Sequence, residues 1–347
     1  MPHMADHISD RPDPQSRETG TLPQRKVSHS APEPSPLSYA IISPVRDEAR
    51  HIRRTLEAIV AQTHLPSEWV IVDDGSTDAT AEIVSEYAAT YPWIRLIPSS
   101  LPGRRVRGSR IVEAFKVGRS ELRASPDLTV KLDGDLYVPP HYFAWVAEVF
   151  VRVPMAGLVG GVGLVWDGAS WVPEKAARHT VLGAFKTYRT ACLDDIGGLQ
   201  SSMGWDGIDE YAARSRGWTV HVLSELSILH FKQRGSAQKW WQARWEEGVG
   251  NAFMGYRPDF VMLRATYRGL VETPRILSGL ALLCGFVWAR ITRRPQVPDP
   301  KAREELRKEQ RTRMRALLTG GRGPSLVPPL TDGGPAFWME GSPGPDG

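Results

Sequence analysis

The stretch Val70-Ile71-Val72-Asp73-Asp74-Gly75-Ser76-Thr77-Asp78 decides the fold predicted for this chain of 347 residues. Its β-branched start indicates a buried strand, which ends on two carboxylates and turns through Gly-Ser-Thr into a helix. Residues 128–135 repeat the pattern with an apolar strand that runs into Asp133 and Asp135. Parallel strands bring such carboxylates to one edge of the sheet, where open α/β folds bind their ligands. Clustered carboxylates need a counter-charge, and a divalent cation on a nucleoside diphosphate would provide it.

The residues around this stretch alternate between strand and helix patterns. Strands are expected at residues 39–43, 69–72, 94–97 and 128–132, and helices at 52–63, 79–91 and 110–119. Asp78 is expected to cap the second of these helices. Such an alternation predicts an α/β fold with a mostly parallel sheet and right-handed crossovers.

Composition divides the chain into four parts. A hydrophobic content of 41% and a charged content of 24% are ordinary for a globular protein. Polar or Gly/Pro-rich composition predicts disordered tails at residues 1–37 and 320–347, which leaves an α/β domain at 38–235 and a helical extension at 236–319. The absence of an apolar targeting segment at the start, with only Cys192 and Cys284 as thiols, predicts a cytoplasmic protein with reduced cysteines.

The formal net charge of +4 is concentrated in two arginine clusters. These clusters are not interleaved with aromatic residues, and no groove-reading motif is present, so we expect no nucleic-acid partner. Phosphate of a small ligand and anionic lipid explain the two clusters better. The clusters contain Arg104, Arg105, Arg107 and Arg110, and Arg290, Arg293 and Arg294.

Three motifs in order resemble the inverting family-2 glycosyltransferases of the GT-A fold. They are Ile-Ser-Pro-Val-Arg-Asp-Glu at 42–48, Asp-Asp-Gly-Ser-Thr-Asp at 73–78, and Asp-Gly-Asp at 133–135. The resemblance extends from about Tyr39 to Gln233 and implies a mixed, mostly parallel sheet flanked by helices, followed here by a C-terminal helical extension. A nucleotide-binding dehydrogenase would instead carry Gly-x-Gly-x-x-Gly after its first strand, and that motif is absent.

The resemblance assigns a nucleotide-sugar site to the first half of the chain. A carboxylate at a pocket wall accepts a uracil imide N–H or a ribose hydroxyl. Arg107 would direct a guanidinium towards phosphate at a helix start, although a solvated basic loop is the alternative. The residues assigned to the base and ribose are Pro44, Arg46, Glu48, Asp73, Asp74 and Asp133.

The resemblance also implies a divalent metal, Mn²⁺ or Mg²⁺. In the family, the second carboxylate of Asp-x-Asp commonly binds the metal, which here is Asp135, and the first contacts ribose or metal, which here is Asp133. After a strand expected at 219–223, His230 ends the segment 227–230 and is the expected late histidine that completes such a site. The alternatives are an Asp-Gly turn that only ends a strand and a structural histidine.

The catalytic base is expected in the second half. The family typically has Glu-Asp there, with the Asp as base, followed by a Gly-aromatic pair. Counting back from Gly217-Trp218 places Asp206 in the base position, but the adjacent acids are Asp209 and Glu210. On a helix that begins near Asp206 all three lie on one face, so each is a candidate for the base. The alternative is that they are acidic residues favoured by the macrodipole near a helix N-terminus.

These parts predict an inverting glycosyltransferase of the hexosyltransferase class. A sugar, from a UDP-sugar by preference, would move to a hydroxyl of a glycan or lipid-linked acceptor in polysaccharide or glycolipid synthesis. One alternative is a catalytically inactive scaffold that binds nucleotide-sugar. Another is a sugar nucleotidyltransferase, although residues 38–55 lack its Gly-rich signature with Arg and Lys.

Residues 276–289 form an apolar run of 14 residues. A membrane-spanning helix needs about 20, so we expect this segment to lie in the interface of the cytoplasmic leaflet. Trp288 and the flanking arginines, which include Arg275, suit an anionic surface. The alternatives are a buried helix or a dimer interface. A charged helix is expected at residues 301–318.

Overall fold

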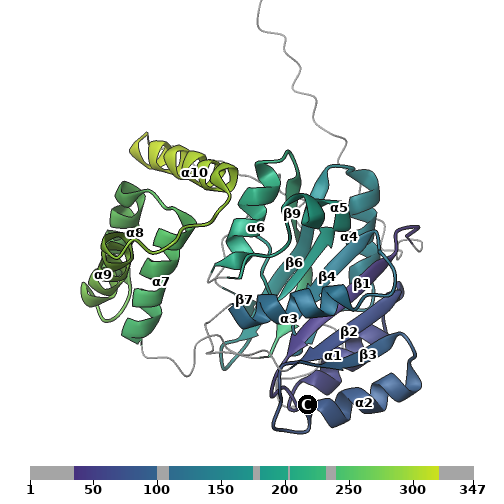
Figure 1. Ribbon diagram of the computed structural model, residues 1–347. Coiled ribbons are helices and arrows are strands. Elements are labelled where there is room, and N and C mark those ends of the chain that lie inside the picture. Colours follow the sequence, from purple (N-terminus) through teal and green to yellow (C-terminus); the bar gives the residue numbers. More distant parts are fainter. Residues whose placement is uncertain (1–34, 100–108, 175–179, 202–203, 232–239, 320–347) are drawn as a thin grey trace, which may run out of the picture. The chain divides into compact units, whose positions relative to one another are not determined.

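The computed structural model describes residues 35–99, 109–174, 180–201, 204–231 and 240–319 (Figure 1). Most of the predicted N-terminal tail and the whole C-terminal tail lie outside these residues. Arg104, Arg105 and Arg107 also lie outside them.

In this part of the chain nine strands form one mixed sheet, in the order β3-β2-β1-β4-β8-β6-β9-β5, with β7 beside β6. Strands β3, β2, β1 and β4 are parallel to one another, and β6 is parallel to β9. Strand β8 is antiparallel to both β4 and β6, and the short β5 and β7 are antiparallel to β9 and β6. The strands are β1 (Tyr39–Val45), β2 (Glu68–Asp73), β3 (Ile94–Pro98), β4 (Leu128–Leu132), β5 (Leu136–Tyr137), β6 (Ala156–Trp166), β7 (Trp171–Pro173), β8 (Phe185–Arg189) and β9 (Thr219–His230).

The predicted α/β class is confirmed, because each expected strand and helix of residues 38–150 is present. The helices are α1 (Ile52–Val60), α2 (Thr80–Thr90), α3 (Ser109–Ser120), α4 (Tyr142–Arg152), α5 (Thr190–Asp195), α6 (Trp205–Arg214), α7 (Trp240–Met254), α8 (Pro258–Val271), α9 (Leu277–Ile291) and α10 (Pro300–Leu318).

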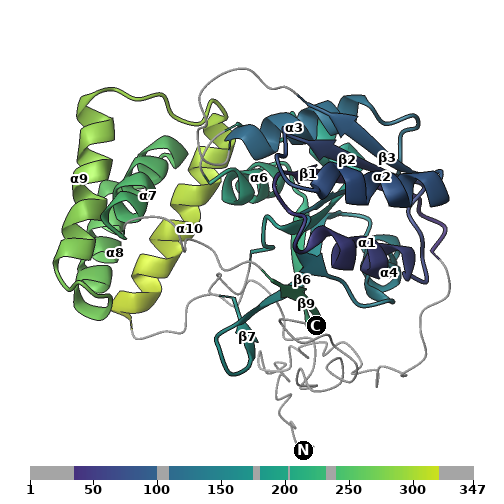
Figure 2. The same ribbon diagram turned by 90° about the horizontal axis from the view of Figure 1, so that it is seen from below.

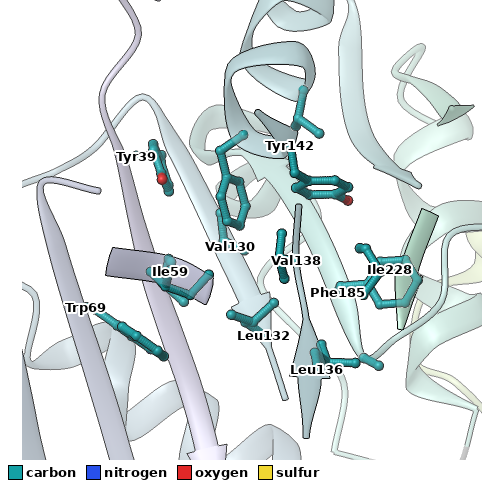
Figure 3. Close-up of a cluster of buried hydrophobic side chains, with 14 of the residues drawn as sticks. Tyr39, Ile59, Trp69, Val130, Leu132, Leu136, Val138, Tyr142, Phe185 and Ile228 are labelled. Atoms are coloured by element: carbon teal, nitrogen blue, oxygen red, sulfur yellow. The ribbon is translucent and has the colours of Figure 1, made fainter. Parts of the chain in front are cut away.

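The sheet is covered on both faces, which explains its nearly continuous apolar strands. Trp69 and Ile71 of β2 pack into one cluster, with side chains of α1, α2 and α4, while Val70 and Val72 pack against α3 on the other face. Figure 3 shows the first cluster, in which Ile59 and Tyr142 share the core with residues of β4. Each buried aliphatic side chain contributes about 1.5–3 kcal/mol.

Two details differ from the sequence-based expectation. Helix α2 begins at Thr80 with Ala79 at its N-cap position, one residue later than expected. The Asp78 carboxylate still accepts a hydrogen bond from the N–H of Thr80, the first residue of the helix, and another from the N–H of Ala49, both at 3.0 Å. The strand expected at 219–223 continues to residue 230 as β9, and an irregularity in its register with β6 absorbs residues 223–226.

Helices α7, α8 and α9 lie together in both ribbon views (Figure 2). Glycines allow α7 and α9 to approach closely, because a Cβ at Gly248 would lie 2.1 Å from the Leu282 carbonyl oxygen and one at Gly285 would lie 2.2 Å from that of Trp245. In the described part of the chain, every helix is too short or too polar to cross a bilayer. Helix α9 buries one face, which includes Leu282, and exposes the opposite face, which includes Leu280.

Candidate active site

Three loops meet at the carboxyl ends of β1, β2 and β4. Strand β1 lies between β2 and β4, with Val45 opposite Asp73 and Ile42 opposite Lys131. The three expected segments 44–48, 73–74 and 133–135 are therefore neighbours. A Cβ at Gly134 would lie 3.1 Å from Val45 Cγ1 and 3.6 Å from Glu48 Cγ, so the absence of a side chain there lets the third loop pack against the first.

Hydrogen bonds hold the first two loops in shape. The Asp73 carboxylate accepts from the N–H of Ser76 at 2.9 Å and from its hydroxyl at 2.5 Å. Asp47 has a positive φ of 52° and accepts from the Thr77 N–H at 2.7 Å, a bond that holds the pKa of Asp47 below its usual value. Arg46 Nη1 donates to the carbonyl oxygen of Asp74 at 2.6 Å. Hydrogen bonds within the protein therefore fix the conformation of both loops.

Asp74 is buried and paired with a guanidinium. Arg110, in the first turn of α3, donates from Nε at 2.6 Å and from Nη2 at 2.5 Å to the two carboxylate oxygens. This bidentate geometry is the strongest form of such a pair. The sequence places Arg110 in a cluster expected near phosphate, whereas in the structure it pairs with a carboxylate of the site.

The two carboxylates of Asp133-Gly134-Asp135 have different partners. Asp133 accepts from the ammonium of Lys131, which also lies 5.4 Å from the centre of the Trp205 ring. Burial raises the pKa of Asp133. Asp135 is 4% exposed, and its Oδ2 lies 3.3 Å from Nε2 of His230. The pairing of β5 with β9, with Leu136 opposite His230, produces this contact.

Asp135 and His230 carry side chains of the kinds that bind divalent metals. In the described part of the chain no group of three His, Cys, Asp or Glu side chains could hold a metal ion alone. The converging donors are one carboxylate and one imidazole, a set that leaves most of the coordination shell to water and phosphate oxygens, as is usual for cations bound with nucleotides. Burial lowers the pKa of His230, but hydrogen bonds to Asp135 and Glu174 raise it to about 10, so a cation that binds Nε2 must displace the proton there.

Asp206 lies close to the same loop. It is half-buried in the first turn of α6, and a Cβ added at Gly183 would lie 2.8 Å from the Cβ of Asp206. The next carbonyl, of Ala184, accepts from the Asp133 N–H at 2.8 Å. The backbone of residues 183–184 is therefore in contact with both Asp206 and the Asp-Gly-Asp loop.

Asp209 and Glu210 are buried in an ion cluster, 2% and 0% exposed. The Lys186 ammonium lies 3.0 Å from both Asp209 oxygens and 3.1 Å from Glu210, and it also donates to the Asp206 carbonyl oxygen. Tyr188 donates to Asp209 at 2.5 Å. Burial raises the pKa of Glu210 to about 7, although the Lys186 charge acts in the opposite direction. Of the three candidate bases, Asp206 is the least buried.

Sequence reasoning missed two residues at the site. Lys131 was visible as a cation within an apolar strand just before the Asp-x-Asp pattern. Glu174 carried no local signal, because it reaches His230 only through the pairing of β7 with β6 and of β6 with β9.

Comparisons with known proteins agree with this architecture. The model of the family "Glycosyltransferase like family 2" matches residues 35–247, which is more than half of the chain. An uncharacterized glycosyltransferase of Nostoc sp. (strain PCC 7120) is 28% identical over 157 residues, which are 44% of this chain and 46% of that protein. An uncharacterized glycosyltransferase of Escherichia coli K12 is 34% identical over 74 residues, 21% of this chain and 22% of that protein. The chain thus spans less than half the length of these relatives.

One solved structure supports the fold. The structure of S. aureus TarS residues 1–349 in complex with UDP-GlcNAc covers 82% of this chain and 93% of its own, with 18% identity and a TM-score of 0.50. The mixed sheet flanked by helices is the GT-A fold, and the chain belongs to glycosyltransferase family 2.

Proposed function

We propose that this protein is an inverting, metal-dependent glycosyltransferase that uses a nucleoside-diphosphate sugar, with a UDP-sugar as first choice. One observation carries the proposal: the Asp-Gly-Asp loop supplies Asp135, which pairs with His230 as metal-type donors, and the loop lies beside the half-buried Asp206. TarS, which shares the fold, is described in complex with UDP-GlcNAc. The acceptor would be a hydroxyl of a glycan or of a lipid-linked sugar.

The residues of the three loops would bind the nucleotide. Their position at the carboxyl edge of a parallel sheet is where open α/β folds place such ligands. The Asp133 carboxylate, steadied by Lys131, is well placed for a ribose hydroxyl. The residues assigned to the base and ribose are Pro44, Arg46, Glu48, Asp73, Asp74 and Asp133.

Asp206 would act as the base. Its carboxylate takes the proton of the acceptor hydroxyl while that oxygen forms a bond to the anomeric carbon. The bond from the anomeric carbon to the diphosphate breaks at the opposite face, so the configuration inverts and the nucleoside diphosphate leaves. Asp135 and His230 would hold Mn²⁺ or Mg²⁺, whose charge would offset the negative charge that grows on the diphosphate. Asp209 and Glu210 would fix α6, the helix that carries Asp206, through their ion pairs with Lys186.

Asp135→Asn tests the donor site. The change removes an anionic oxygen ligand but retains the shape of the side chain, so UDP affinity in the presence of Mn²⁺ should fall by about tenfold or more. Isothermal titration with and without Mn²⁺ measures this effect, with Glu86→Gln on the exposed face of α2 as the control. Equal UDP affinity of the wild type and Asp135→Asn, whether or not Mn²⁺ is present, would contradict the proposed metal dependence.

We further propose that α8 and α9 attach the protein to an anionic membrane surface. Apolar side chains are exposed on both helices although the helices pack together. The arginines of residues 275–294 are also exposed, namely Arg275, Arg290, Arg293 and Arg294. No acidic residue occurs between Glu272 and Asp299 in the sequence. An apolar face bordered by cations suits an anionic bilayer interface. The exposed apolar residues include Tyr267, Leu270, Val271, Leu277, Leu280 and Ile291.

Co-sedimentation with liposomes tests this attachment. Binding should require anionic lipid and weaken at high salt, because each arginine contributes on the order of 1 kcal/mol in a salt-screened interaction. The double variant Arg290→Glu/Arg293→Glu should lose binding, whereas Arg152→Glu on α4 should retain it. If the wild type ignores all vesicles and sediments as a dimer that Leu280→Asp dissociates, the face is a subunit interface instead.

A further inference from the structure

His230 lies between two carboxylates. Its Nε2 is 3.3 Å from Asp135 Oδ2, and its Nδ1 is 3.1 Å from Oε2 of Glu174. All three side chains are less than a tenth exposed. Glu174 therefore touches the ring on the side opposite to Asp135.

The sheet brings Glu174 to this place across β6. The N–H of Glu174 donates to the carbonyl oxygen of Gly163 at 2.8 Å, and Gly163 in turn lies opposite Ile228 of β9. A Cβ at Gly163 would lie 3.2 Å from Oε2 of Glu174. The missing side chain of Gly163 thus leaves room for the carboxylate to pass over β6 and reach His230.

This arrangement has a chemical consequence for a histidine that binds metal. An imidazole binds a cation through the lone pair of one nitrogen, and its proton then sits on the other nitrogen. That N–H needs an acceptor, which fixes both the tautomer and the orientation of the ring. With Nε2 directed towards Asp135, the acceptor must lie at Nδ1, where the carboxylate of Glu174 is found.

We propose that Glu174 is a positioning residue of the metal centre. Its carboxylate accepts a hydrogen bond from the Nδ1–H of His230 and thereby directs Nε2 towards the cation beside Asp135. Glu174 acts through His230 and does not itself bind the cation. The inference rests on the proposed function, because it presupposes a metal at Asp135 and His230. A glutamate that served only to stabilise the fold would affect unfolding but leave metal affinity unchanged.

The test measures Mn²⁺ binding directly, by the electron paramagnetic resonance signal of free Mn²⁺ in titrations of the 347-residue chain with UDP. Glu174→Ala removes the acceptor and should weaken Mn²⁺ binding by about 10–100-fold, the usual effect of such outer partners. Glu174→Gln keeps an amide oxygen as acceptor and should show a smaller loss. It also serves if the alanine variant fails to fold, which circular dichroism would reveal. Asp135→Asn and the surface variant Glu86→Gln are measured alongside.

The outcomes separate this inference from the proposed function. Weaker Mn²⁺ binding by Asp135→Asn and by both Glu174 variants, in the expected order, supports both. A loss with Asp135→Asn but wild-type affinity in the folded Glu174 variants overturns the role of Glu174 and leaves the metal site in place. Unchanged affinity in all variants overturns the metal site, and the role of Glu174 with it.

Discussion

Asp74, Asp209 and Glu210 are acidic residues whose charge is compensated inside the protein. Asp74 is held by Arg110, and the other two by Lys186. Removing one partner of such a buried pair leaves an uncompensated charge, which costs more than the pair itself contributes. Asp206 is instead only half-buried, so its carboxylate is more accessible to an acceptor than those of Asp209 and Glu210.

Glu210 should make stability depend on pH. Its pKa is raised by burial from 4.5 to about 7, so the folded state holds this proton more tightly than the unfolded state does. The stability that this provides is present below pH 4.5 and is lost as the pH rises through about 7. Glu210→Gln cannot lose a proton there, so from pH 5 to pH 8 the variant should gain stability relative to the wild type, by up to about 3 kcal/mol.

Urea unfolding at pH 5 and at pH 8 measures this difference, and Glu225→Gln on β9, away from the cluster, is the control. The opposite sign, with Glu210→Gln losing more stability at pH 8 than at pH 5, would mean that the ion pairs with Lys186 and Arg214 outweigh the cost of burial.

At the level of elements, the sequence predicts those helices and strands that local residue patterns determine. Strands β1, β2 and β4 were predictable because consecutive apolar residues end at carboxylates or proline. Strands β5 and β7 were not, because they contain two and three residues and exist only through pairing with β9 and β6. The apolar run before Arg290 predicted a helix, but only its packing on α7 and α8 determines which face is exposed.

The α7–α9 contact should be sensitive to a single methyl group. A Cβ at Gly285 would lie 2.2 Å from a backbone oxygen, so Gly285→Ala must separate the helices despite the better helix propensity of alanine. We expect a loss of about 1–3 kcal/mol in the free energy of unfolding, as for overpacked cores. Cys284→Ala, the preceding exposed position, is the matched control. Equal stability of Gly285→Ala and Cys284→Ala in urea would contradict the close approach.

In the whole molecule, strand order determines which predicted site residues meet. The segments 44–48, 73–74 and 133–135 follow neighbouring strands, so their convergence was predictable from an alternating α/β pattern. Helix periodicity correctly placed Asp206, Asp209 and Glu210 near one another. It could not show that the last two face Lys186 of β8, because that depends on how α6 packs on the sheet.

Turnover of nucleotide-sugar by the purified protein tests the central claim most directly. Release of UDP from UDP-GlcNAc and other UDP-sugars is followed with Mn²⁺, with water as acceptor where no better one is supplied. The wild type should release UDP from at least one donor. Asp206→Asn should release it more slowly by about 100-fold or more, since a positioned base contributes about 10²–10⁴-fold. Its affinity for UDP should be unchanged, and Asp194→Asn, an exposed acid outside the site, should behave as wild type. Tight donor binding without turnover by the wild type, or full turnover by Asp206→Asn, would contradict the account.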